Sequence, residues 1–485
     1  MNYKQLAVDG IRWSSMTSML SFSIGLIQIA IIARYLSPDE IGIISLVTVI
    51  IGTGRVFGDA GMSNAIIHFQ DLNAQQINAL YWINVIVAFF ISSAIFFLAL
   101  PIANLLSTAD LAPFIRIMSF AIVLGSIGQQ FYILLKRDFH FKEISLIDLA
   151  QRVVIFMSII IMLVVWKMGI LSVIYATVIG SIVYSIVSIM IGLKYFNLPN
   201  LIAVNFSNLK ECLRFGGFQF MDMSVGYLSS NLDKLFIGRF FGTDVLGIYE
   251  LATVLINRPI SIINPMFNNV SFPLFSKMQH DLPRLNQWYI KKIAIISMIS
   301  AAIYCGMYSI RYELVEFIYG EDWNMIASSL SVLFILGYFK SVSNPMGTYV
   351  LALGRPDISL YFKLYQICIH ISLLVIGVLF YDYMTAITIY VAGAIIFTIP
   401  PEYYMRYYLS KMPVSPLFFK IIKHFFLAMI MVILIYFSRH LFTQYNLNNT
   451  VYMLILISLG VLFYGLINLI LNQKLLKELL SLIRR

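Results

Sequence analysis

The residues IARYLSPDEIGIISLVTVI at positions 32–50 align without a gap with IGRFFGTDVLGIYELATVL at positions 237–255. The identical pairs include Arg34 and Arg239, Asp39 and Asp244, Gly42 and Gly247, Ile43 and Ile248, Leu46 and Leu251, and Thr48 and Thr253. The two copies are 205 residues apart, the distance from Arg34 to Arg239. Repeats of this kind are typical of membrane transporters built from two similar halves. The alignment therefore predicts a duplicated fold.

The composition around this repeat is that of a protein embedded in a lipid bilayer. The chain has 485 residues, of which 60% are hydrophobic and 12% are charged, and its mean hydropathy is +0.86. A soluble domain carries about 25% charged residues. The apolar residues come in runs of about 20, the length that crosses roughly 30 Å of hydrocarbon as a helix. The sequence excludes a soluble fold.

Fourteen apolar runs are predicted to be transmembrane helices, so we expect an all-α integral membrane protein. The predicted spans are residues 13–33, 43–65, 79–101, 113–135, 146–166, 170–192, 216–238, 247–269, 291–311, 326–350, 359–380, 384–404, 421–438 and 450–471. Six spans separate the two copies of the repeat, so both copies start on the same side of the membrane. We predict an N-lobe of helices 1–6 over residues 1–200 and a C-lobe of helices 7–12 over residues 201–412, related by a pseudo-two-fold axis. Residues 413–485 are predicted to form helices 13 and 14 and a cytoplasmic tail.

The loops between the predicted spans differ in charge, which predicts the orientation. With the N-terminus inside, 22 Lys and Arg residues fall on the inner side of the membrane. The outer side holds 5, namely Arg34, Lys167, Arg239, Arg311 and Arg439. Both termini are therefore predicted to be cytoplasmic. The N-terminal residues MNYKQLAVDGIRW lack the apolar core and cleavage site of a removable signal peptide, so we expect the first helix to remain as an anchor.

Motifs and charge argue against several other functions for this chain. The net charge of +10 comes from short loops rather than from a basic face on a soluble module, so nucleic acid is not an expected partner. Cys212, Cys305 and Cys368 lie far apart and match no metal-binding spacing. No Walker, HExxH or GxSxG motif occurs in a compatible context. The sequence favours transport over catalysis and predicts no cofactor.

Polar residues form a stripe along one face of the second predicted helix and of its repeat partner, helix 8. The helix 2 stripe comprises Ser45, Thr48, Gly52, Arg55, Asp59 and Ser63, and the helix 8 stripe comprises Glu250, Thr253, Asn257, Ser261, Asn264 and Asn268. Spacings of three and four residues place each set on one helix face. The 205-residue offset relates all of these positions except Arg55 and Ser261. The two stripes predict lobes that share a hydrophilic central cavity.

Ionisable and amide residues within the spans are the candidate binding residues, because a central Arg, Lys or Asp costs roughly 2.5–3.5 kcal/mol to insert. The candidate substrate-binding residues are Arg55, Asp59, Asp222, Asp233, Lys234, Asn257, Arg258, Lys340 and Asn344.

Each of these candidates has a structural alternative. Arg55 and Asp59 are one turn apart and could neutralise each other, and Lys234 could pair with Asp233. Arg258 lies about 100° off the helix 8 stripe, so cavity lining and packing elsewhere are both open. A further arginine, Arg116, lies near the outer end of helix 4, where snorkelling accounts for it.

Several segments together resemble a known family of exporters. They are the repeat at 32–50, GDAGMSNAIIHFQ at 58–70, LYWIN at 80–84, LKRDFHFKEIS at 135–145, LRFGGF at 213–218, YGEDWN at 319–324 and SNPMGTYVLALGRPDIS at 343–359. They resemble the polysaccharide flippases of the colanic acid and teichuronic acid exporter type. These flippases belong to the superfamily of multidrug, oligosaccharidyl-lipid and polysaccharide exporters.

The resemblance implies two six-helix lobes in a V shape, working by alternating access in a bacterial cytoplasmic membrane. The implied substrate is an undecaprenyl pyrophosphate carrying one glycan repeat unit, destined for a surface polysaccharide. In the related peptidoglycan-precursor flippases, arginines facing the cavity bind the pyrophosphate, and Arg55 and Arg258 are the counterparts here. This sequence departs at helix 1, whose arginines, Arg12 and Arg34, lie only at its ends. The expected partners are the lipid-linked oligosaccharide and the lipid bilayer, with a polysaccharide polymerase and chain-length machinery as further candidates.

Two other functions fit the same architecture. A cation-coupled multidrug exporter would need carboxylates and aromatic rings in its cavity, whereas a lipid pyrophosphate needs arginines. A membrane glycan polymerase or ligase would need a large outer loop, which the sequence does not provide. Asp59, Asp222 and Asp233 are candidates for coupling transport to an H⁺ or Na⁺ gradient.

Overall fold

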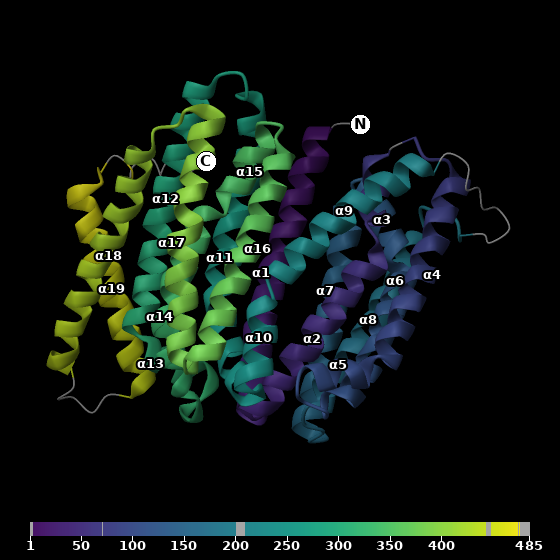
Figure 1. Ribbon diagram of the computed structural model, residues 1–485, viewed down its shortest axis with the longest axis horizontal. Coiled ribbons are helices and arrows are strands. Elements are labelled where there is room, and N and C mark those ends of the chain that lie inside the picture. Colours follow the sequence, from purple (N-terminus) through teal and green to yellow (C-terminus); the bar gives the residue numbers. More distant parts are fainter. Residues whose placement is uncertain (1–2, 70, 200–208, 443–447, 474, 476–485) are drawn as a thin grey trace. The chain divides into compact units, whose positions relative to one another are not determined.

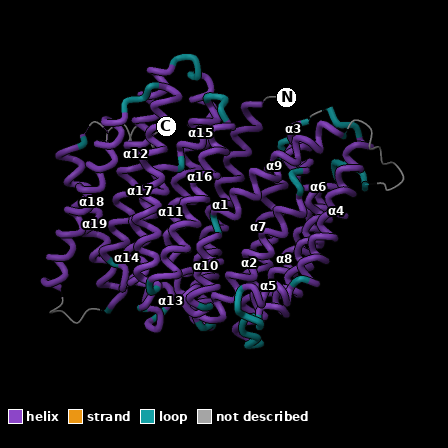
Figure 2. The backbone as a smooth tube through the Cα atoms, viewed as in Figure 1, coloured by secondary structure: helices purple, strands orange, loops and turns teal. Residues whose placement is uncertain are grey.

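The computed structural model describes residues 3–69, 71–199, 209–442, 448–473 and 475, and every regular element in these ranges is a helix (Figure 1, Figure 2). Thirteen of the described helices are long and apolar enough to cross a membrane. The predicted all-α membrane protein is therefore confirmed. The predicted lobe boundary at residues 200 and 201 and the end of the predicted cytoplasmic tail lie outside the described residues.

The helices of the first half are mostly long, with short helices between them. They are α1 (Tyr3–Tyr35), α2 (Pro38–Asp59), α3 (Met62–His68), α4 (Ala74–Phe97), α5 (Ala99–Leu105), α6 (Leu111–Arg137), α7 (Phe141–Ile160) with a π-helical end η1 (Ile161–Val165), α8 (Leu171–Gly192), α9 (Lys210–Ser229) and α10 (Leu232–Phe241).

The second half has the same character. Its helices are α11 (Thr243–Lys277), α12 (Leu282–Ser309), α13 (Arg311–Tyr319), the 3₁₀-helix η2 (Glu321–Trp323), α14 (Met325–Ser343), α15 (Pro345–Ala352), α16 (Pro356–Phe380), α17 (Tyr383–Ser410), α18 (Val414–Phe442) and α19 (Asn449–Leu471).

The predicted span 216–238 is not one helix. It is divided into α9 and α10 by a turn at Ser230 and Asn231, where the Asn231 amide donates to the Tyr227 carbonyl at 2.9 Å. The polar residues Gln219 and Asp222 lower the hydropathy of α9, which is not among the thirteen spanning helices. This break is the main difference from the predicted set of spans.

Two other predicted spans are shorter than the helices that contain them. The predicted span 291–311 begins nine residues after the start of α12, which holds Lys292 well inside the helix, and the predicted span 384–404 ends before Arg406, which lies within α17. Both side chains are buried. Hydropathy places a span boundary at a charge, whereas Lys292 has a partner on α11 and Arg406 pairs with Glu402 of its own helix.

The chain forms two compact units, Met1–Gly247 and Ile248–Arg485. In the first unit, α6 packs closely on α8 and α2 packs on α4, α6 and α9. A Cβ on Gly128 of α6 would lie 2.4 Å from the Ser185 Cα, and the Gly128 N–H donates to the Ser185 hydroxyl at 3.1 Å. Small residues of this kind allow close helix packing in a membrane. The predicted lobes of six helices stay a prediction.

The second unit is built around α12, which packs on α14 and α18. Buried hydroxyls join these helices: Ser297 bonds Tyr338 at 2.7 Å, Ser300 bonds Ser341 at 2.8 Å, and Tyr338 donates to the Ile421 carbonyl at 2.8 Å. Interhelical hydrogen bonds of this kind hold helices together where lipid offers no competing partner.

The N-termini of α2 and α11 contact each other through two glycines that are equivalent in the repeat. A Cβ on Gly42 would lie 1.9 Å from the Thr243 carbonyl oxygen, and a Cβ on Gly247 would lie 1.9 Å from the Pro38 carbonyl oxygen. The 205-residue offset turns Gly42 into Gly247 and Pro38 into Thr243. Each contact is therefore the repeat image of the other.

We expect Gly42→Ala and Gly247→Ala each to destabilise the protein by about 1–3 kcal/mol, the usual cost of overpacking, because the new methyl group would clash with a backbone carbonyl. Thermal unfolding of the purified protein in detergent measures the effect. Gly217→Ala on α9 is the matched control, because no atom lies within 4 Å of its added Cβ. Unfolding midpoints equal to that of the control would contradict the close contact.

Candidate functional site

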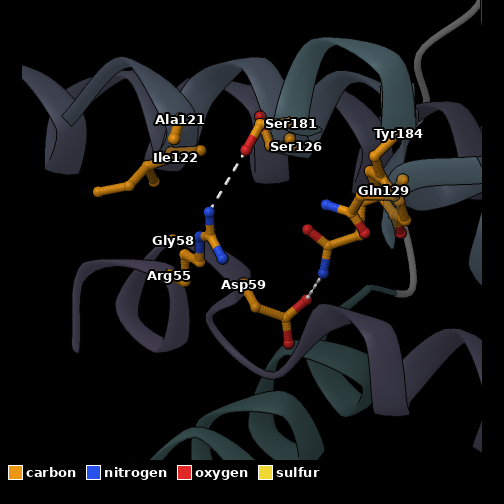
Figure 3. Close-up of a pocket in the computed structure, with 12 residues that line it drawn as sticks. Arg55, Gly58, Asp59, Ala121, Ile122, Ser126, Gln129, Ser181 and Tyr184 are labelled. Carbon is orange, nitrogen blue, oxygen red and sulfur yellow. Dashed lines mark hydrogen bonds between the residues drawn. The ribbon is translucent and has the colours of Figure 1, made fainter. Parts of the chain in front are cut away.

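A cavity of about 260 Å³ lies within the first unit, between α2, α4, α6, α7 and α8 (Figure 3). Its lining residues are Arg55, Gly58, Asp59, Ala88, Ala121, Ile122, Gly125, Ser126, Gln129, Gln151, Ser181 and Tyr184. It therefore contains two of the predicted binding residues, Arg55 and Asp59. Small residues on α4 and α6 leave room for polar side chains from α2, α6, α7 and α8.

Arg55 is the cation of this cavity. Its side chain is exposed and lies on the last turn but one of α2, pointing toward α8, where its Nη2 atom donates to the Ser181 hydroxyl at 3.3 Å (Figure 3). The Ser181 hydroxyl in turn donates to the Thr177 carbonyl at 3.1 Å. A guanidinium has five N–H donors, so a single long bond to a neutral hydroxyl leaves most of them available to a ligand.

Asp59 is buried, with 7% of its surface exposed, and it faces α6. One carboxylate oxygen accepts from the Ser63 hydroxyl and from the Gln129 amide, the latter at 2.6 Å (Figure 3). The other oxygen, Oδ2, is buried and has no hydrogen-bond partner in the described part of the chain. The end of α2 explains this geometry, because Ala60 (φ 47°) and Gly61 (φ 73°) both adopt left-handed backbone and return Ser63 to the carboxylate.

The alternative in which Arg55 and Asp59 neutralise each other is not what the structure shows, because no ion pair joins these two described side chains. The spacing of one helical turn allowed the pair. Ser63 and Gln129 offer Asp59 closer donors, and Ser181 holds Arg55 on the other side of the cavity. The cation of the cavity is thus not neutralised by the adjacent carboxylate.

The helix 2 and helix 8 stripes match in burial at two equivalent pairs of positions. Asp59 and Asn264 are both buried, and Ser63 and Asn268 are both half-buried. Equivalent buried positions thus carry a carboxylate in one unit and an amide in the other. That both stripes face one central cavity stays a prediction.

The remaining predicted residues of the first unit lie away from this cavity. Asp222 is half-buried on α9. Asp233 is buried in the first turn of α10, where its carboxylate accepts from the Lys234 backbone N–H at 2.9 Å, a favourable place for an acid. Asp222, Asp233 and Lys234 are all absent from the lining of the cavity beside Arg55. A role for them in substrate binding stays a prediction.

In the second unit, Asn257, Lys340 and Asn344 are exposed and Arg258 is half-buried. Asn344 ends α14 just before Pro345 begins α15, and its side-chain oxygen accepts from the Asn268 amide at 2.8 Å. The predicted role of these four residues in substrate binding is not tested by their positions within this unit and stays a prediction.

Several polar residues at notable positions escaped sequence reasoning. Gln129, Gln151 and Ser181 line the Arg55 cavity but are neutral, so the cost of inserting a charge gave no signal for them. Glu402 and Arg406 are buried and form an ion pair at 2.8 Å within α17. The opposite charges four residues apart were the signal that would have found this pair.

Comparison with known proteins places the chain in a family. Residues 31–328, more than half of the chain, match the family described as polysaccharide biosynthesis protein. The chain belongs to this family of membrane proteins, as its sequence motifs predicted.

Individual relatives agree with this assignment. The chain is 29% identical over 377 residues to the lipopolysaccharide biosynthesis protein WzxC of Escherichia coli K12, covering 78% of this chain and 76% of that protein. It is 24% identical over 363 residues to the teichuronic acid biosynthesis protein TuaB of Bacillus subtilis 168, covering 73% of each chain.

Solved structures share the fold at lower sequence identity. The lipid II flippase MurJ in an inward closed conformation matches with a TM-score of 0.78 and 17% identity, covering 95% of this chain and 99% of that one. An inward-facing multidrug resistance MATE family transporter of the MOP superfamily matches with a TM-score of 0.66 and 15% identity, covering 83% and 98%. The protein is therefore a multi-pass membrane protein with the fold of these transporters.

Proposed function

We propose that the protein translocates an undecaprenyl-pyrophosphate-linked oligosaccharide repeat unit across the bacterial cytoplasmic membrane by alternating access, for surface polysaccharide biosynthesis. The observation that carries this proposal is the Arg55 cavity. An exposed guanidinium whose one bond is to a neutral hydroxyl, with the adjacent carboxylate turned away to α6, has most of its donors available to an anion. A pyrophosphate is a dense anion, and arginine binds phosphate through planar, bidentate hydrogen bonds.

The other parts of the substrate have separate requirements. Sugars need hydroxyl and amide partners, which Gln129, Gln151 and Ser181 supply around Arg55. The cavity of about 260 Å³ is too small for an oligosaccharide, since drug-sized ligands alone fill about 300–1,000 Å³. Arg55 would therefore hold the pyrophosphate end, while the glycan lies beyond this cavity and the polyprenyl chain stays in lipid.

The orientation and the partners belong to the same proposal. Both termini are cytoplasmic in it, and the pyrophosphate group is received from the inner leaflet. The translocated unit would be consumed outside by a polysaccharide polymerase and its chain-length machinery. The protein itself forms no covalent bond with the substrate, so it acts as a transporter and not as an enzyme.

Deletion of the gene in the source bacterium tests this function. We expect lipid-linked repeat units to accumulate, as measured by mass spectrometry of lipid extracts, and surface polysaccharide to disappear. Re-expression of the native chain should reverse both effects. Unchanged amounts of the lipid-linked repeat unit and of surface polysaccharide, together with increased sensitivity to cationic drugs, would contradict the proposal and favour a multidrug exporter.

A further inference from the structure

Lys292 is a buried cation in the second unit, remote in sequence from the Arg55 cavity. It lies on α12 with 7% of its surface exposed. Its ammonium donates to the Asn268 side-chain oxygen at 2.8 Å and lies 5.4 Å from the centre of the Phe275 ring. Neither partner is charged. A buried ammonium without a carboxylate is costly, so its retention here calls for a function.

The ammonium fixes the direction of a chain of hydrogen bonds. An ammonium can only donate, so Asn268 must turn its oxygen toward Lys292 and its NH₂ group away from it. The Asn268 NH₂ group donates to the Asn344 oxygen at 2.8 Å. The NH₂ group of Asn344 is therefore the free end of the chain. Lys292 thus imposes a donor, rather than an acceptor, on the exposed Asn344 side chain.

Lys340 lies one turn before Asn344 on the same face of α14, and its side chain is exposed. The continuous span Met325–Ala352 places it 15 residues from one end and 12 from the other, or about 22 and 18 Å along a helix. An ionisable residue this far inside a spanning segment usually faces a bundle interior or a water-filled cavity. We therefore expect Lys340 to face water or a ligand, and among the described residues it has no hydrogen-bond or ion-pair partner.

The charges nearby add to a positive field. Glu402, which accepts from the Ser343 hydroxyl at 2.8 Å, is neutralised by Arg406 at 2.8 Å. Lys292 and Lys340 remain without a carboxylate partner in the described part of this unit. Two donors, an ammonium and a polarised amide, therefore share one exposed face with an excess of positive charge behind them.

We propose that Lys340 and Asn344 bind an oxyanion, with Lys292 and Asn268 as positioning residues that polarise Asn344. This inference rests on the proposed function for the identity of its ligand. It adds a second anion-binding site to that function. The shared chemistry is a phosphate or carboxylate group. Its source is either the pyrophosphate of the lipid carrier or an acidic sugar in the glycan.

Binding measurements on the purified full chain in lipid nanodiscs test the site apart from transport. The probes are farnesyl pyrophosphate, a glucuronate oligosaccharide and uncharged farnesol. Each experiment uses Arg55→Ala as the background, so that the first cavity does not contribute. We expect Lys340→Ala to weaken binding of at least one anionic probe about 10- to 100-fold, the range for a lost hydrogen bond to a charged group. Farnesol binding should not change.

Lys292 variants separate polarisation from structure. Lys292→Met should weaken the same anionic probe about tenfold, as expected for coupling through one network, although Lys292 does not touch it. Lys292→Arg should restore most of the affinity because it keeps the charge and the donors. The matched control is Lys291→Met, since Lys291 is exposed on the same helix with its ammonium 5.8 Å from the Trp288 ring.

The two anionic probes distinguish the sources of the ligand. Loss of affinity for farnesyl pyrophosphate alone assigns the site to the lipid carrier, and loss for the glucuronate oligosaccharide alone assigns it to the glycan. Native affinity for both anionic probes in Lys340→Ala and Lys292→Met would overturn the site. Because binding is measured without transport, failure of the proposed flippase activity leaves this result interpretable.

Discussion

Arg55→Ala is expected to abolish export of the lipid-linked repeat unit while leaving the protein folded and inserted. Removing one partner of the charge pair that Arg55 forms with bound substrate costs about 2–5 kcal/mol, and each 1.4 kcal/mol is tenfold, so transport should fall by roughly 30-fold or more. Folding should survive because Arg55 is exposed and has one neutral partner, Ser181, at 3.3 Å. Arg55→Lys should recover only part of the activity, since an ammonium keeps the charge but loses the bidentate geometry.

The measurement is the amount of surface polysaccharide and of lipid-linked intermediate in cells expressing each variant at matched levels. Arg116→Ala is the matched control, because Arg116 is an exposed arginine in the same unit whose guanidinium lies 5.8 Å from the Phe96 ring. Full export by the Arg55→Ala protein would refute a role for Arg55 in holding the pyrophosphate.

Asp59→Asn tests the other ionisable residue of the cavity. An asparagine oxygen can still accept from Ser63 and Gln129, and the change removes a buried carboxylate oxygen that lacks a partner within the described chain. Because Asp59 does not orient Arg55, we expect near-native export. A loss as deep as that of Arg55→Ala, in a stably folded variant, would instead assign a coupling proton or ion to Asp59.

Glu402→Leu is expected to destabilise the second unit by about 3–5 kcal/mol, the usual cost of leaving one partner of a buried ion pair alone. The pair is enclosed, with 4% and 6% of the Arg406 and Glu402 side chains exposed. The Arg406 guanidinium also lies 5.4 Å from the Tyr289 ring and 5.0 Å from the Tyr403 ring, so it cannot turn to solvent. Yield and thermal unfolding of the purified protein measure the effect.

The double variant Glu402→Leu, Arg406→Met is the control for this prediction. It removes both charges and keeps much of the volume, so most of the lost stability should return. If the single variant unfolds at the native temperature, or the double variant is less stable than the single one, the buried pair does not stabilise this unit as described.

Sequence reasoning predicted the type of fold because hydropathy and helix length have the same physical cause, the thickness of the bilayer. It also located Arg55 and Asp59, since a charge in an apolar run is conspicuous. It did not predict the hydrogen-bond partners of these two residues. Helical periodicity gives the face on which a residue lies, whereas the partners Gln129 and Ser181 come from α6 and α8.

The errors at α12 and α17 share one cause. A charge set one end of each predicted span, but tertiary contacts decide whether that charge can be buried. Lys292 finds Asn268 on α11, and Glu402 finds Ser343 on α14, neither of which is close in sequence. Conversely, the α9 and α10 break depends on a turn at Ser230 and Asn231 that the apolar pattern across 216–238 did not reveal.

The glycine contact between α2 and α11 has a consequence for how the chain tolerates substitution. A contact that is its own repeat image is isologous, the kind that a closed dimer makes with a single surface patch. In a dimer of identical chains, one substitution at such a glycine would alter both sides of the contact at once. In this chain Gly42 and Gly247 are separate positions, and each meets a backbone carbonyl, that of Thr243 or that of Pro38. Because no change of side chain on the opposite helix removes a backbone carbonyl, each position must stay small independently of the other.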